Sequence, residues 1–143
     1  MYERDYILRL IMQVGRMLTA MLHAIREQRP DDALETAREA VAALLDTDIA
    51  LADAMTGEGL VAFLAAGGRT DVLRSRMLGE LLMARADAYA AVGCEGSAMA
   101  ERARARTVLE AAALEADGEE ADRISELLEQ LGWEPRRGQD VRW

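Results

Sequence analysis

The chain has 143 residues, 51% of them hydrophobic, which is enough for one domain with its own core. Its 17 basic and 26 acidic residues give a formal net charge of −9, which excludes nucleic acid and anionic membranes as general partners. The single cysteine, the charged opening segment and the shortness of every apolar run lead us to expect a cytoplasmic protein without a membrane span.

The first predicted element is a long helix over residues 2–28. Its apolar residues recur at helical spacing and form one stripe, made of Ile7, Leu10, Ile11, Val14, Met17, Leu18, Met21 and Ile25. Leu8, Met12 and Leu22 widen the stripe to roughly 200° of the helix circumference, against about 100° for an ordinary surface helix. A helix this apolar is either central to its own domain or shared with a second chain.

Six further helices follow in a single helical domain over residues 1–132. Alanine and leucine are the commonest residues, and no stretch alternates with period two, so no strand is expected. The next helix starts near Pro30, because proline and acidic residues suit a first helical turn. We expect turns at 56–59, 67–68 and 93–97, a polar tail over 133–143, and helices over 31–45, 49–55, 60–66, 72–92, 98–116 and 119–131. The predicted fold class is all-α, built of antiparallel helical hairpins.

Two hairpins of this chain match each other in sequence. The same spacing separates Ala33 from Ala98, Ala40 from Ala105, and Leu44 from Leu109. The pattern resembles the tetratricopeptide repeat, a helix-turn-helix unit of about 34 residues. The better copy consists of Leu82, Ala86, Tyr89, Gly93, Ala98 and Ala105. The resemblance implies a tetratricopeptide-like array, and the alternative is an irregular helical bundle.

The chain also resembles an uncharacterised bacterial family of small, all-helical proteins, a domain of unknown function. The residues that carry this resemblance are the opening segment Asp5-Tyr6-Ile7-Leu8-Arg9, the segment Leu78-Gly79-Glu80-Leu81-Leu82, and Tyr89 with Gly93. The family has no assigned activity, so the resemblance implies a fold and no chemistry.

Few residues could carry catalysis. The chain has no lysine, which removes Schiff-base chemistry and a phosphate-loop lysine. The only histidine, His23, lies on the polar strip of the first helix, and Cys94 lies in a turn after a helix end. One histidine and one cysteine cannot complete a tetrahedral metal set. We therefore expect no catalytic residue, metal or cofactor. We expect Arg102, Arg104 and Arg106 to form a solvated face, with anion binding as the alternative.

The tetratricopeptide resemblance implies a groove wall made of Met83, Asp87 and Ala90. Grooves of that family that clamp a terminal carboxylate use lysine and asparagine, and this chain contains neither. A peptide bound here would therefore be apolar or basic.

These observations favour a non-enzymatic interaction or scaffold protein that forms a homodimer and binds an unknown protein or peptide. The predicted self-association residues lie on the first helix and are Leu8, Met12, Met17, Met21 and Leu22. Later helices of the same chain could instead cover this face. The alternative function is a small-ligand-binding protein or enzyme with an interhelical carboxylate pocket. A nucleic-acid regulator acting through its arginines is disfavoured by the net charge.

Overall fold

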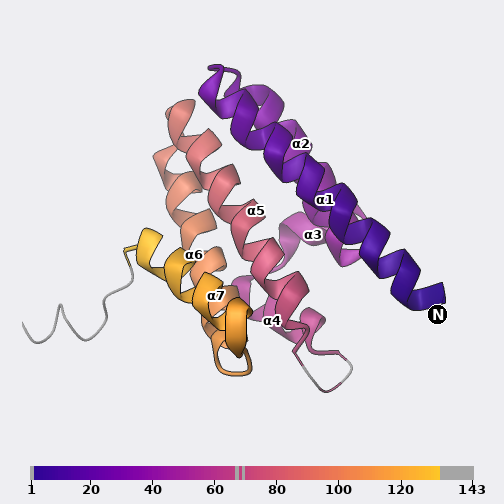
Figure 1. The fold of residues 1–143 in the computed structure, drawn as a ribbon. Helices are drawn as coiled ribbons and strands as arrows, with labels where there is room; N and C mark the ends of the chain where they lie inside the picture. The colour runs from indigo at the N-terminus through magenta and orange to yellow at the C-terminus, as the bar shows by residue number, and fades with distance from the viewer. Residues whose placement is uncertain (1, 67, 69, 133–143) are drawn as a thin grey trace, which may run out of the picture.

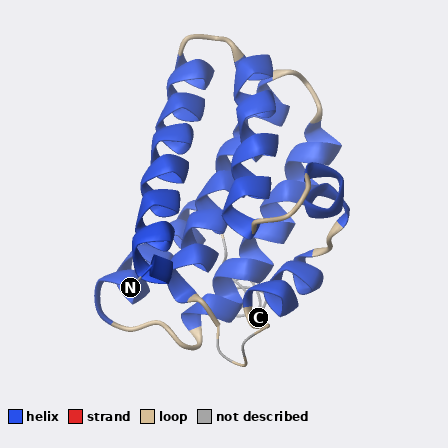
Figure 2. Ribbon diagram, turned by 90° about the vertical axis from the view of Figure 1, so that its right-hand side faces the viewer, coloured by secondary structure: helices blue, strands red, loops and turns tan. Residues whose placement is uncertain are grey.

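A computed structural model describes residues 2–66, 68 and 70–132. Within these residues the regular elements are all helices, and loops connect them (Figure 2). The predicted all-α fold class is confirmed. Gly67, at the expected turn 67–68, and the tail 133–143 lie outside the described residues. The helices are α1 (Tyr2–Arg26), α2 (Pro30–Leu45), α3 (Ile49–Ala54), α4 (Gly57–Leu64), α5 (Val72–Ala91), α6 (Glu95–Ala113) and α7 (Gly118–Gln130).

Two helices begin earlier than the sequence predicted. Residues 56–59 are not a separate turn, because the Thr56 hydroxyl accepts a hydrogen bond from the amide of Gly59 at 3.0 Å and caps α4. Residues 95–97 belong to α6 rather than to a turn. Gly93, with φ +85°, reverses the chain within three residues of the end of α5, so α6 can start at Glu95.

The long helices pack as two hairpins (Figure 1). α1 packs along α2, α5 packs along α6, and contacts between α2 and α5 join the hairpins. The short helices α3 and α4 connect them, while α7 packs against α5 and α6. This arrangement leaves α1 at one side of the molecule, with α2 and α5 as its neighbours.

Small residues set the distance between the paired helices. The matched alanines Ala33, Ala40, Ala98 and Ala105 are all fully buried. A methyl group added to Gly79 would lie 2.6 Å from the Leu109 side chain, so α5 and α6 approach closely at this point. Between α5 and α6 the core therefore packs a small residue of one helix against a large residue of the other.

Candidate functional site

One face of α1 carries exposed apolar side chains. Leu8, Met12 and Leu22 are 52%, 61% and 41% exposed. Gly15 and Thr19 lie between them, and the five positions follow one another at alternating steps of four and three residues. This is the spacing at which a helix presents a seam to a second helix. We call these five residues the outer seam.

Gly15 has no packing reason among the residues that the structure describes. A methyl group added to it would meet no atom of these residues within 4 Å. Glycine inside a helix costs about 0.5–1 kcal/mol relative to alanine. Thr19 donates its hydroxyl proton to the Gly15 carbonyl at 3.1 Å, so this hydroxyl needs no other partner. A glycine at the middle of an exposed seam allows the close approach of another backbone.

The opposite face of α1 packs on its own domain. Leu10, Val14 and Met21 are buried there, and Met17 is half-buried against the same core. At 100° per residue, the centre of this face lies about 150° from the centre of the outer seam. Of the predicted self-association residues, Leu8, Met12 and Leu22 are available, whereas Met21 is only 1% exposed. Placing Met21 at the interface was wrong, because α2 and α5 already cover its face of α1.

The predicted groove wall lies where α1, α5 and α7 meet. Met83 and Asp87 line a hollow there together with Leu22 and Leu127, but Ala90 is not part of its lining. Burial raises the pKa of Asp87, and the charge of Arg102 opposes this shift. The hollow holds about 130 Å³, less than the ~300–1,000 Å³ of small-molecule sites. It admits a side chain rather than a segment of peptide.

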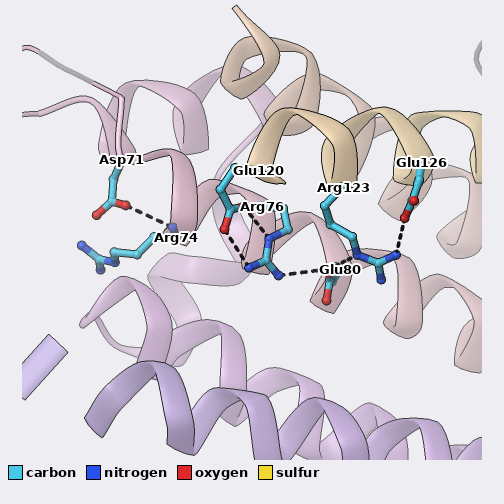
Figure 3. A network of polar contacts seen from close by, with 7 residues as sticks. All are labelled: Asp71, Arg74, Arg76, Glu80, Glu120, Arg123 and Glu126. Carbon is cyan, nitrogen blue, oxygen red and sulfur yellow. Dashed lines mark hydrogen bonds and ion pairs between the residues drawn. The ribbon is translucent and has the colours of Figure 1, made fainter. Parts of the chain in front are cut away.

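Ion pairs attach α7 to α5 beside this hollow (Figure 3). Arg76 donates to Glu120 at 2.8 Å and to Glu80 at 3.1 Å. Arg123 of α7 donates to the same Glu80 at 3.1 Å and to Glu126 at 3.1 Å. The hydrogen bond to Glu120 is the main cause that raises the pKa of Arg76. The buried side chains Ile124, Leu127 and Leu128 pack α7 onto the domain, and the ion pairs add to this attachment without assigning any chemistry.

A second cluster of charged residues lies deeper, between α3, α5 and α6. Arg85 and Glu101 are only 6% and 5% exposed, although they are charged. Arg85 donates to Asp53 at 3.1 Å and lies 3.3 Å from Glu101, which accepts from Arg104 at 2.6 Å. Arg85, Glu101, Arg104 and Asp53 line a cavity of about 330 Å³, together with Tyr89. We call this the charged cavity.

This cluster was not predicted from the sequence. Arg104 does not belong to a solvated face, because it bonds Glu101 and the Ala52 carbonyl. Arg106 likewise donates to the Leu131 carbonyl, so that expectation was wrong for both residues. One signal was present: Glu101 lies one helical turn from Ala98 and one from Ala105, on the face of α6 that packs inward.

Two further residues were considered for catalysis or metal binding, Cys94 and His23. Cys94 is exposed and precedes α6 without a side-chain cap bond, and His23 is exposed on α1. Among the residues that the structure describes, no three His, Cys, Asp or Glu side chains gather closely enough to hold a metal ion. Over the same residues, no helix is long and apolar enough to cross a membrane.

The described residues form an all-helical protein of packed hairpins, with exposed apolar side chains on one face of α1 and a charged cavity between α3, α5 and α6. No protein-family model, curated protein or solved structure matches this chain.

Proposed function

We propose that this protein is a non-enzymatic interaction or scaffold protein that forms a homodimer through the outer seam of α1. The observation that carries the proposal is an exposed seam with coiled-coil spacing and an otherwise unexplained glycine at its centre. Monomers seldom leave large apolar patches bare. Two copies related by a two-fold axis are the commonest closed assembly.

The seam is symmetric about Gly15, which favours antiparallel α1 helices. Leu8 and Leu22 lie seven residues on either side of Gly15, about 10 Å away along the axis in each direction. An antiparallel crossing at Gly15 brings Leu8 against the partner's Leu22.

The first test is the mass of the protein in solution by light scattering. We expect a dimer at micromolar concentration for the natural chain and a folded monomer for Met12→Glu with Leu22→Glu. The matched control, Gln13→Glu with Ala20→Glu, places the same charges on exposed positions of α1 outside the seam and should remain a dimer. A monomer mass for the natural chain would show that the proposal is wrong.

The second test is the direction of the helices, by disulfide cross-linking in a Cys94→Ser background. A disulfide needs Cα atoms within about 7 Å. Gly15→Cys should cross-link to itself. Leu8→Cys should cross-link only when mixed with Leu22→Cys. Cross-linking of Leu8→Cys with itself would indicate parallel helices and contradict the antiparallel arrangement.

We also propose that the two hairpins stack in a tetratricopeptide-like manner. The burial of the equivalent alanines Ala33 and Ala98, and Ala40 and Ala105, supports this. An experimental structure in which α2 and α6 occupy equivalent places in superimposed hairpins is the expected result. Hairpins that do not superimpose would favour an irregular bundle.

A further inference from the structure

We propose that the hollow where α1, α5 and α7 meet holds the side chain of Trp133, the first residue of the C-terminal tail over residues 133–143. The tail then attaches α7 to α1 and occupies the groove that the tetratricopeptide resemblance implied. The described part of the chain ends at Gly132, two residues after Gln130, which lines the hollow. This inference goes beyond self-association and does not depend on it.

The hollow has the size and the lining of a site for one aromatic side chain. Its apolar lining consists of Leu18, Leu22, Met83, Ala84 and Leu127. Its volume is about 130 Å³, and an apolar cavity of about 150 Å³ holds one benzene ring, the size of the larger ring of an indole. A buried indole N–H also needs an acceptor. The side-chain oxygens of Asp87 and Gln130, which line the same hollow, can accept that hydrogen bond.

The end of α7 turns the chain in the way that brings the next side chain back onto the helix. Gly132 has φ +72°, and its amide donates to the Glu129 carbonyl at 2.9 Å. These are the left-handed residue and one of the two hydrogen bonds of the Schellman motif. In this motif the residue after the glycine commonly packs against a side chain of the last helical turn. For Trp133 the corresponding side chains are Leu127 and Leu128, and Leu127 lines the hollow.

The start of the tail is fixed beside the hollow. Arg106 of α6 donates to the Leu131 carbonyl at 3.3 Å, and the Leu131 side chain packs against the core. Trp133 follows two residues later, so its Cα lies within about 7 Å of that of Leu131. A side chain tethered this close has a high effective concentration at the hollow. Docking within the chain is therefore favoured over docking of a side chain from another molecule.

The tail also has the chemistry expected of a ligand for this groove, which is apolar or basic. Trp133 supplies the apolar group. The charged residues of the tail are Arg136, Arg137, Arg142, Glu134 and Asp140. Of the 17 basic and 26 acidic residues of the chain, 14 and 24 lie before the tail, which gives that part a net charge of −10 and attracts the more basic tail. Any partner that uses the hollow must first displace the tail.

Fluorescence of the full chain tests the proposal, because the sequence contains only two tryptophans. Trp143→Phe leaves Trp133 as the single reporter. We expect its emission at a shorter wavelength than in the chain unfolded by denaturant, and several-fold weaker quenching by acrylamide.

A second copy of the chain must be excluded as the source of this protection, because Leu22 belongs both to the hollow and to the outer seam. The measurement is therefore repeated with Leu8→Glu and Met12→Glu, which disrupt the seam but do not line the hollow. We expect the same protection of Trp133 in this background.

A matched pair of substitutions locates the protection. Leu22 and Leu51 are 41% and 48% exposed, but of these two only Leu22 lines the hollow. In the background with the disrupted seam, Leu22→Glu should make Trp133 several-fold more accessible to acrylamide, whereas Leu51→Glu should leave its accessibility unchanged.

The melting temperature gives an independent measure. Trp133→Ala should lower it by at least ~3 °C, because the substitution removes a buried aromatic side chain. Trp143→Ala, the matched control in the same tail, should leave it unchanged.

Four outcomes would overturn the proposal. Quenching of Trp133 equal to that in the unfolded chain would show that the hollow does not hold it. Protection that disappears when the seam is disrupted would make a second copy its source. Protection that survives Leu22→Glu would place Trp133 elsewhere on the surface. An unchanged melting temperature for Trp133→Ala would show that its side chain is not buried.

Discussion

Replacing Gly15 with alanine separates the stability of the single chain from the strength of its self-association. In the single chain, the added methyl group meets no atom of residues 2–66, 68 and 70–132 within 4 Å, so it causes no clash there. Alanine in a helix interior is favoured over glycine by about 0.5–1 kcal/mol. The corresponding rise in melting temperature is about 1–4 °C for a domain of this size. In the dimer, the same methyl group lies at the helix crossing and should weaken association.

The experiment compares two backgrounds. In the monomeric variant Met12→Glu with Leu22→Glu, denaturant titration should show that Gly15→Ala stabilises the chain by about 0.5–1 kcal/mol. In the natural background, light scattering should show a higher dissociation constant for the dimer. The difference between backgrounds isolates the interface contribution, as in a double-mutant cycle.

Gly79→Ala is the contrasting control, because its new methyl group would lie 2.6 Å from Leu109. It should destabilise the chain by about 1–3 kcal/mol in both backgrounds. If Gly15→Ala also destabilises the monomeric variant, Gly15 is needed within the chain, and its link to the interface is refuted. If Gly15→Ala leaves the dissociation constant of the dimer unchanged in the natural background, the crossing point of the two helices does not lie at Gly15.

Three further predictions concern the single chain. Ala105→Leu should lower the free energy of unfolding, measured by denaturant titration, by about 1–3 kcal/mol, because the larger side chain overpacks the core. A loss under ~0.5 kcal/mol would mean that Ala105 is not confined between helices. Glu80→Gln should lower the free energy of unfolding by about 1–2 kcal/mol, because Glu80 accepts charged hydrogen bonds from Arg76 and from Arg123. A loss within ~0.5 kcal/mol would mean that these bonds do not hold α7. Burial raises the folded-state pKa of Asp87, so the folded chain binds this proton more tightly and stability falls as the pH rises through that pKa. Asp87→Asn should remove this fall and leave a melting temperature at neutral pH no lower than that of the natural chain, and a lower one would contradict the reasoning.

Local patterns in the sequence determined the helices. The apolar period of α1, Pro30 at the start of α2 and Gly93 after α5 all act within one or two turns, so they can be read without knowing the fold. The burial of Ala105 was predicted from its sequence match with Ala40, and both residues are fully buried. The early starts of α4 and α6 were missed because a cap or a single positive φ decides such boundaries, not the apolar period.

Only the tertiary structure decided which apolar and charged groups are covered. The periodicity of α1 showed a wide apolar arc, but contacts with α2 and α5 decided that Met21 lies inside and Met12 outside. The charged cavity depends on Asp53 and Arg85, which lie on helices distant in sequence, and on Glu101 of a third. A charged residue has no local signature of burial, because its cost is offset only by partners that long-range packing brings to it.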